Sequence, residues 1–231
     1  MLQSKLNVLK EMIIYLSSLA EDMILITIRG LLEYDTERLD EALLLEDKIN
    51  NVDIEIDELS ITMIALYQPG AKDLRTIISI MKMNSDFERM GDLCVNIIYA
   101  TKQIISKPRI RQFATLSSMV HDTVEMLQNA LNAYINEDAR LAKQVCEFDD
   151  VIDNYKDTLT RELIEYMTQE KDNIESALQL LSIVQNLERI ADHCTNIAEE
   201  TIYIVNGRVI KHHHDDMGQF TLSIFYVKNN P

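Results

Sequence analysis

Residues 88–97 read ERMGDLCVNI, and residues 188–197 read ERIADHCTNI. Six of the ten letters are identical, and in each copy an Asp follows the Glu after four positions. Two copies of one pattern, one hundred residues apart, are typical of an internal duplication. The same helical segment is therefore expected once in each of two related halves of the chain.

A second match lies upstream of each copy, at an offset of 103 residues. The matched pairs are Glu46 with Asp149, Ile49 with Ile152, and Asn50 with Asp153. The two offsets differ by only three residues, as they would if the loop between the matched segments differed in length. The match thus extends the duplication beyond the ten-residue motif.

The composition and the apolar spacing both favour helices. The 231 residues include only five Gly and three Pro, which is too few for the many tight turns of an all-β fold. Breaks at residues 68–73, 106–110 and 205–209 separate runs with a helical apolar period. Helices are predicted at 2–33, 36–67, 71–105, 111–135, 138–168 and 173–205. The prediction is an all-α protein of two tandem antiparallel three-helix bundles, over residues 1–106 and 110–206, with a C-terminal tail over residues 207–231.

The third predicted helix of each half carries an apolar seam with alternating spacings of three and four residues, the pattern of a helix that packs on partner helices. Cys94 and Cys194 occupy one position of the seam and are expected to be small buried hydrophobes. The seam residues are Ile80, Met83, Phe87, Met90, Cys94, Ile97, Thr101 and Ile104 in the first half, and Leu180, Ile183, Leu187, Ile190, Cys194, Ile197, Thr201 and Ile204 in the second.

The acidic letters of the motif fall on the other face of the helix. Residues four apart are neighbours on a helix, so Glu88, Asp92 and Asn96 form a ladder of oxygen-bearing side chains. Like charges at this spacing destabilise a helix by a few tenths of a kcal/mol. Carboxylate and amide oxygens suit Mg²⁺, Ca²⁺, Mn²⁺ or iron, which would relieve that repulsion. A metal-binding ladder facing away from the core is predicted here, and the second copy repeats it with Glu188, Asp192 and Asn196.

Two carboxylates do not complete a metal site, and the second helix of each half offers further acids. The sequence alone does not show whether these acids reach the ladder. Gly91, which corresponds to Ala191, lacks a side chain in mid-helix, and a close approach by another group beside the acids is the expected reason. The candidate acids are Glu46 and Asp47 in the first half, and Asp149, Asp150 and Asp153 in the second.

The charge and the cysteines restrict the partners and the compartment. The formal net charge is −16, and no basic stripe is present to bind a phosphate backbone, so nucleic acid is not expected as a partner. An acidic surface suits cations or a basic protein face. Three widely spaced cysteines indicate a reducing compartment. No stretch is long and apolar enough to cross a membrane. A cytoplasmic protein without membrane insertion is expected.

The duplicated ERxxD turn, the segment YQPGAKDLR at 67–75 and the segment IVNGRVIKHH at 204–213 make this chain resemble the PhoU family over residues 1 to about 214. The resemblance implies a cytoplasmic regulator of phosphate uptake. Such a protein restrains a phosphate-sensing histidine kinase and couples it to the ATPase subunit of a phosphate ABC transporter. It also implies bound metal ions, with Mg, Mn, Fe and Zn as candidates. Carried over by position, the metal role falls on Glu88, Asp92, Glu188 and Asp192, with Asn96 and Asn196 as helpers.

The chain departs from the family pattern in three places. Glu46 and Asn50 are weaker ligands than their counterparts Asp149 and Asp153, so the first site is expected to bind metal less tightly. Ala191 stands where the motif usually has Gly. The tail contains HHHDD at 212–216, where histidines bind transition metals non-specifically, and a strand-like TLSIFYV at 221–227; residues 218–231 have no counterpart in the family.

Two other functions compete with this interpretation. A di-metal carboxylate protein of ferritin type would direct its acids inward and use Glu-x-x-His motifs, but His193 is replaced by Leu93 in the other copy. A metal-free helical adaptor would use the acids only for solubility. No hydrolytic motif is present, so no catalytic activity is expected. The sequence leaves open whether the chain forms a homodimer.

Overall fold

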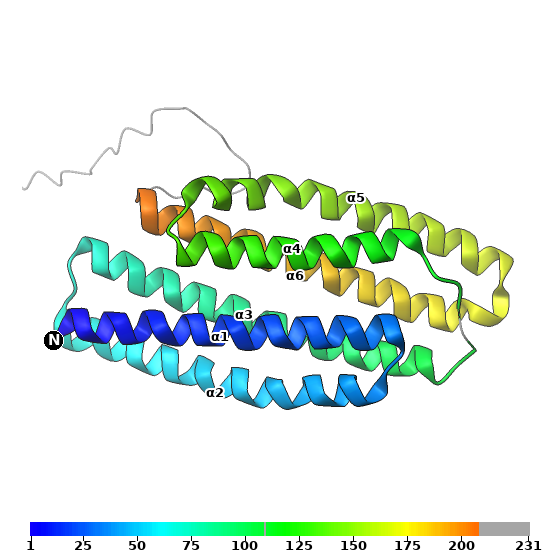
Figure 1. Cartoon of the computed structure of the whole chain (residues 1–231), viewed down its shortest axis with the longest axis horizontal. Helices are drawn as coiled ribbons and strands as arrows, with labels where there is room; N and C mark the ends of the chain where they lie inside the picture. Colours follow the sequence, from blue (N-terminus) through cyan, green and yellow to red (C-terminus); the bar gives the residue numbers. More distant parts are fainter. Residues whose placement is uncertain (109, 208–231) are drawn as a thin grey trace, which may run out of the picture.

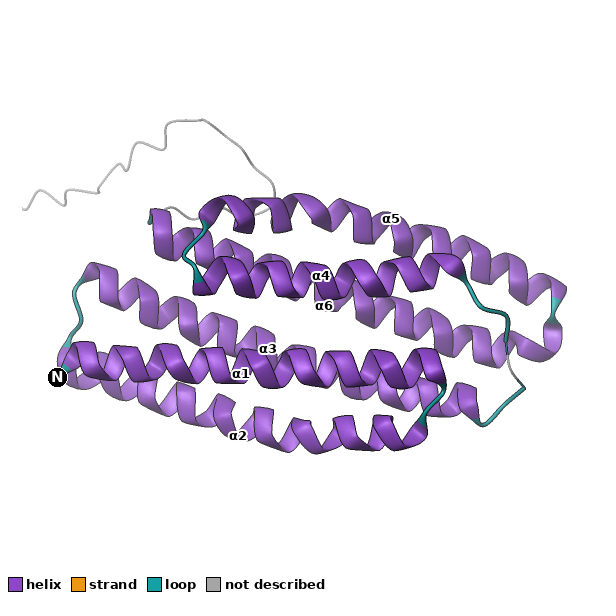
Figure 2. Ribbon diagram, viewed as in Figure 1, coloured by secondary structure: helices purple, strands orange, loops and turns teal. Residues whose placement is uncertain are grey.

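The computed structural model describes residues 1–108 and 110–207, which form six α-helices, one short 3₁₀-helix and no strand. Helices α1 to α3 make one antiparallel bundle and α4 to α6 a second one beside it (Figures 1 and 2). The two-bundle, all-α prediction is confirmed. The elements are α1 (Leu2–Glu33), α2 (Thr36–Tyr67), α3 (Ala71–Ile105), α4 (Ala114–Ile135), α5 (Ala139–Gln169), the 3₁₀-helix Lys171–Asn173 and α6 (Ile174–Asn206).

The largest difference from the predicted ranges is at the start of α4, which begins at Ala114 rather than at residue 111. Phe113 has an extended backbone and is buried. Its ring packs edge-to-face on the ring of Tyr166, with 5.7 Å between the centroids, and the Arg111 guanidinium lies over it. These side-chain contacts hold the connecting segment in place without a helix. The His-rich segment 212–216 and the strand-like segment 221–227 lie outside the described residues.

The turns before α2 and α5 repeat each other in detail. Asp35 and Asp138 are 103 residues apart, and each side chain accepts hydrogen bonds from the two backbone N–H groups at the start of the following helix. Tyr34 and Glu137, which precede them, both adopt positive φ angles, 58° and 51°. The duplication thus preserves the turn geometry although Tyr and Glu share no chemistry.

The seam of α3 and α6 forms the centre of each bundle. All sixteen seam residues are buried except Ile204, which is half-buried, and burial raises the pKa of the Cys94 thiol to about 12. Helices α3 and α6 also form the largest contact between the bundles. They run antiparallel, because Ser79 near the start of α3 meets Glu200 near the end of α6 (Oγ to Oε2, 2.7 Å). The two acidic turns are therefore carried by the two central helices.

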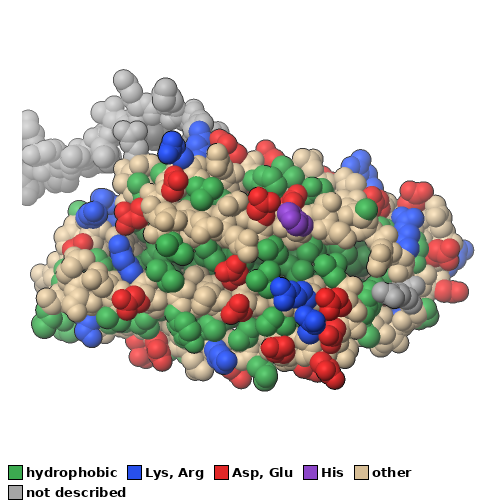
Figure 3. All heavy atoms as spheres, viewed as in Figure 1, with side chains coloured by type: hydrophobic (Ala, Val, Ile, Leu, Met, Phe, Trp, Pro, Cys, Tyr) green, Lys and Arg blue, Asp and Glu red, His purple; other side chains and the backbone are tan. Residues whose placement is uncertain are grey.

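Helices α1 and α4 meet along one face of the molecule, where hydrophobic side chains gather between the bundles (Figure 3). At the end of this line lies a cleft of about 240 Å³, between the end of α1 and the segment before α4. Its walls include Leu32, Ile104 and Phe113. None of the described helices is both long and apolar enough to cross a membrane.

Candidate metal-binding surface

Both acidic ladders lie on the outside of their bundles. Asp92 and Asn96 on α3 are exposed and Glu88 is half-buried. The same pattern recurs on α6, where Asp192 and Asn196 are exposed and Glu188 is half-buried. The cysteine and isoleucine of the motif point into the core, so the division of the motif into a core face and an outer face is as predicted.

In the first half, α2 adds two acids to the ladder. Burial, then the charge of Asp92, raises the pKa of Glu46 above its usual value. Burial also raises the pKa of Glu88, together with the charges of Asp92 and Asp53. These four carboxylates, Glu46, Asp53, Glu88 and Asp92, are called the first acidic cluster. At Glu46 and Glu88, the charges of neighbouring carboxylates thus add to the effect of burial.

Asp53 is a member of this cluster that the sequence did not single out. The buried Asn84 side chain of α3 donates to Asp53 Oδ1 at 2.6 Å and to its backbone carbonyl oxygen at 3.0 Å. Burial and the charge of Asp57 raise the pKa of Asp53. The side-chain oxygen of Asn84 is buried and has no hydrogen-bond partner among the described residues. Asn84 thus fixes Asp53 beside Glu88.

The second half gathers the corresponding acids. Partial burial raises the pKa of Asp192 to about 6, and the charges of Glu188, Asp149 and Asp153 add to the effect. These four residues are called the second acidic cluster. Two of the three α5 acids that the sequence offered as candidates, Asp149 and Asp153, therefore come within electrostatic reach of the ladder. Asp149 in addition lies 3.4 Å from the Thr195 hydroxyl, which donates to its Oδ1.

A lysine enters the second acidic cluster but not the first. Lys156 Nζ lies 2.7 Å from Glu188 Oε1 and 2.8 Å from Asp153 Oδ1. At the offset of 103 residues that relates α2 to α5, Lys156 occupies the position of Asp53. Among residues 1–108 and 110–207, no Lys or Arg makes a comparable ion pair with Glu46, Asp53, Glu88 or Asp92. The clusters have carboxylates at three matched positions, Glu46 and Asp149, Glu88 and Glu188, and Asp92 and Asp192. They differ at Asp53, which is Lys156 in the second half, and at Asp153, which is Asn50 in the first.

The two ladder asparagines have different surroundings. Asn196 Nδ2 donates to Asp86 Oδ1 of α3 at 3.0 Å, and His193 Nδ1 lies 2.8 Å from the same oxygen. This network crosses from one bundle to the other, and the side chains of Asp86 and His193 are nearly buried. Asn96 on α3 is also exposed, and its side chain makes no hydrogen bond with another of the described residues. The amide of Asn196 is thus used between the bundles, and a metal role for either asparagine stays a prediction.

The predicted reason for Gly91 is wrong. A Cβ at this position would meet Ile49 Cδ1 at 3.5 Å and Met23 Sδ at 3.9 Å, which are ordinary contacts. Gly91 is buried and faces the core of its bundle instead of the acids. No close approach beside the cluster requires a glycine, in agreement with Ala191 in the other copy.

The first acidic cluster has the donor chemistry of a hard divalent cation. Burial, followed by the charge of Asp92, raises the pKa values of Glu46 and Glu88, and a bound cation would offset the like charge. The carboxylate oxygens of the first acidic cluster do not lie close enough together in this structure to coordinate one ion as a group of three. Within the described part of the chain, three potential ligand atoms come within 4.8 Å of one another only at His121, Asp122 and Glu125.

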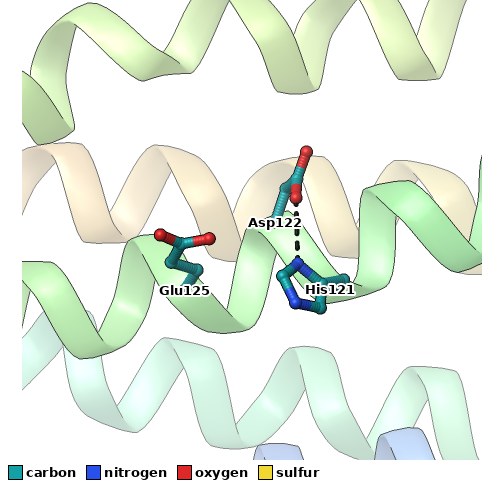
Figure 4. A group of neighbouring side chains, drawn as sticks. All are labelled: His121, Asp122 and Glu125. Carbon is teal, nitrogen blue, oxygen red and sulfur yellow. Dashed lines mark hydrogen bonds and ion pairs between the residues drawn. The ribbon is translucent and has the colours of Figure 1, made fainter.

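The group of His121, Asp122 and Glu125 lies on a single helix, α4 (Figure 4). The His121 side chain is 75% exposed, and its Nδ1 is 3.1 Å from Asp122 Oδ1. The other oxygen of Asp122 accepts a hydrogen bond from the Tyr155 hydroxyl at 2.9 Å. This group has no counterpart in the other half, and His121 and Asp122 already have hydrogen-bond partners within the protein.

A model of the PhoU domain family matches residues 13–101 and again residues 116–201, once in each bundle. This chain belongs to the PhoU family. A phosphate-specific transport system accessory protein PhoU homolog of Aquifex aeolicus is 35% identical over 205 residues, which cover 89% of this chain and 93% of that protein. The corresponding homolog of Pseudomonas aeruginosa is 31% identical over 210 residues, covering 90% of this chain and 87% of that one.

Solved PhoU structures have the same fold. The crystal structure of PhoU from Pseudomonas aeruginosa matches with a TM-score of 0.87 at 31% identity, over 90% of this chain and all of that chain. The phosphate transport system regulatory protein PhoU from Streptococcus pneumoniae matches with a TM-score of 0.85 at 29% identity, over 92% of this chain and all of that chain. The PhoU architecture therefore extends over both bundles.

Proposed function

We propose that this chain is an accessory protein that regulates phosphate uptake and phosphate-responsive signalling. The observation that carries the proposal is the match to PhoU proteins across both bundles, since those relatives are accessory proteins of phosphate-specific transport systems. The function resides in contacts with other proteins. Its partners are the ATPase subunit of a phosphate ABC transporter and a phosphate-sensing histidine kinase, whose activity it restrains.

The proposal places this chain in the cytoplasm, where both partners would present their regulatory domains. Support comes from the cysteines, because Cys94, Cys146 and Cys194 are all unpaired in the structure. Burial raises the pKa of Cys146 to about 12, with smaller contributions from the charges of Glu199 and Asp149. Such thiols react slowly, and a chain with three of them is suited to a reducing compartment.

The proposal includes a divalent cation, with Mg, Mn, Fe and Zn as candidates, at the first acidic cluster. Glu88 and Asp92 would be its principal ligands, and Glu46 and Asp53 would supply oxygens from α2. When bound, the cation would offset the negative charge of this surface and could bridge it to an acidic group on a partner. The outward position of the acids supports this role over the ferritin-type alternative, in which ligands lie inside the bundle.

The test is recovery of partners by the tagged full-length chain from phosphate-replete cells. The variant with Glu88→Gln, Asp92→Asn, Glu188→Gln and Asp192→Asn is compared with wild type. Recovery of the transporter ATPase or the sensor kinase by wild type, with a clear loss in the four-acid variant, is the expected result.

A charge-matched control keeps this comparison specific. Glu11→Gln, Glu41→Gln, Glu58→Gln and Asp172→Asn remove the same number of charges from exposed positions outside both clusters. This control is expected to recover partners as wild type does. Recovery of neither partner by wild type would contradict the regulatory role, and equal recovery by the four-acid variant would contradict a role for the acidic turns.

A further inference from the structure

The second acidic cluster contains its own cation. Lys156 lies on α5, at the position that corresponds to Asp53 of α2 in the duplication. Its ammonium contacts one carboxylate from each of two helices, Asp153 on α5 and Glu188 on α6, at 2.8 and 2.7 Å. An ammonium between two carboxylates provides the charge compensation that a metal ion would otherwise provide.

The surroundings of Lys156 favour its charged form. The side chains of Lys156 and Glu188 are 29% and 19% exposed, so the pair is shielded from solvent more than an ordinary surface ion pair. Both hydrogen bonds of its ammonium, to Asp153 and to Glu188, run from a positive donor to a negative acceptor. A metal ion entering this cluster would have to displace the ammonium from both carboxylates and leave it beside the metal's own positive charge.

The first acidic cluster lacks such a group. Asp53, in the place of Lys156, carries a negative charge and is held by the neutral amide of Asn84. The position of Asn84 in the other half is taken by Val184, which has no polar group to hold an acid. The substitutions on both helices are thus consistent with each other. At these two positions the first half has an acid and its supporting amide, and the second half has a lysine and an apolar residue.

We infer that Lys156 occupies the cation position of the second acidic cluster and keeps divalent metal ions out of it. The inference rests on the proposed function, since it assumes that the acidic turns are built for cations. It confines metal binding by this chain to the first half. This reverses the order of affinity expected from Asn50 and Asp153 alone, because an ammonium within 3 Å of two ligands outweighs one additional carboxylate.

The experiment counts Mn²⁺ ions bound per chain by equilibrium dialysis. All proteins are full length and carry His212→Asn, His213→Asn and His214→Asn, which removes binding by the tail. Lys156→Asp restores the acid of the first half. Lys5→Asp, an exposed position near the start of α1, makes the same charge change away from both clusters. Circular dichroism verifies the fold of each variant.

The inference predicts about one additional Mn²⁺ per chain in Lys156→Asp, and none in Lys5→Asp. Adding Glu188→Gln and Asp192→Asn to Lys156→Asp is expected to remove the additional ion. Should Lys156→Asp not fold, Lys156→Met frees the same two carboxylates without adding charge and is expected to gain the ion as well. An unchanged count in the folded lysine variants would overturn the inference, as would a loss of Mn²⁺ on Glu188→Gln in otherwise wild-type protein.

The same measurement separates this inference from the proposed function. If wild type binds no Mn²⁺ and Lys156→Asp binds one ion, Lys156 has the assigned role and the metal site of the first half is refuted. If wild type binds one ion that Glu88→Gln removes, but Lys156→Asp gains none, the proposed site stands and the role of Lys156 is refuted.

Discussion

Asp86 of α3 and Asn196 of α6 connect the two bundles through a hydrogen bond of 3.0 Å, in which the Asn196 amide donates to Asp86 Oδ1. His193 lies 2.8 Å from the same oxygen. In the pseudosymmetric position Asn186 replaces Asp86, and Leu93 replaces His193. Among the described residues, this polar contact between α3 and α6 therefore has no counterpart at the pseudosymmetric position.

Asp86→Ala is expected to lower the free energy of unfolding by about 1–3 kcal/mol, because the nearly buried His193 ring and the Asn196 amide lose their common acceptor. Urea denaturation measures this change. Asn96→Ala, at the exposed equivalent of Asn196, is the matched control and is expected to change the value by less than about 0.5 kcal/mol. Equal effects of the two variants would show that the network does not hold the bundles together.

Gly91→Ala is expected to stabilise the protein by about 0.5–1 kcal/mol, since Ala favours the helix and the new methyl group meets Ile49 at an ordinary distance. Gly30→Ala is the opposite case, because its Cβ would lie 2.6 Å from Leu39 Cδ2, and it is expected to destabilise by about 1–3 kcal/mol. Thermal and urea unfolding of both variants check the pair. Destabilisation by Gly91→Ala would restore the idea that another group approaches this position.

Asp192 is expected to make stability depend on pH in a defined direction. Its pKa in the folded protein is about 6, above the usual 3.8, so folding favours the protonated form. The stability it contributes is present below pH 4 and is lost as the pH rises through 6. Because the side chain is only partly buried, solvent screening keeps this contribution below about 1 kcal/mol.

The measurement is the difference in unfolding free energy between wild type and Asp192→Asn, in the presence of a chelator, from pH 4 to pH 7. Wild type is expected to lose stability relative to the variant over this interval. Asp157→Asn, at an exposed position of α5 outside the cluster, is the control. A difference that is constant with pH, or that changes in the opposite direction, would contradict the raised pKa.

The cysteines are expected to resist modification in the folded protein. Burial raises the pKa of Cys94 to about 12 and raises that of Cys194 further, and alkylation requires the thiolate. Iodoacetamide followed by mass spectrometry should find both thiols unmodified in native protein and alkylated in guanidinium. Rapid native labelling of Cys94, with the fold intact by circular dichroism, would mean that the seam opens.

Much of the fold could be predicted from the sequence because local signals agree with each other. The apolar period, the rare Gly and Pro, and the repeated motif all indicate six helices in two bundles, and the seam placed Cys94 and Cys194 correctly in the core. The start of α4 was predicted too early because Phe113 and Tyr166 hold that segment by a contact across 53 positions of the chain. Apolar periodicity carries no information on such contacts.

The candidate site was predicted only where the two halves agree. The ladder acids, and Glu46 with Asp149, were singled out because they occur twice. Asp53 and Lys156 were missed because the halves differ at this position, so a search for repeated letters passes over it. The difference could nevertheless be read from the sequence once the offset of 103 residues was known. Asp53 lies about one helical turn beyond Asn50, and Lys156 lies at the same distance beyond Asp153. The Asp86 network depends on the antiparallel packing of α3 on α6, which the sequence pattern does not specify.

The central claim is that the duplicated acidic turn binds a divalent cation at one of its two copies. The most direct measurement is anomalous X-ray diffraction at the manganese absorption edge from crystals of the full-length chain grown with Mn²⁺. The expected result is a peak beside Glu88 and Asp92 of the first acidic cluster, with the Lys156 ammonium still between Asp153 and Glu188 and no peak there. A peak of equal height at the second cluster, or the lack of one at the first, would contradict the account.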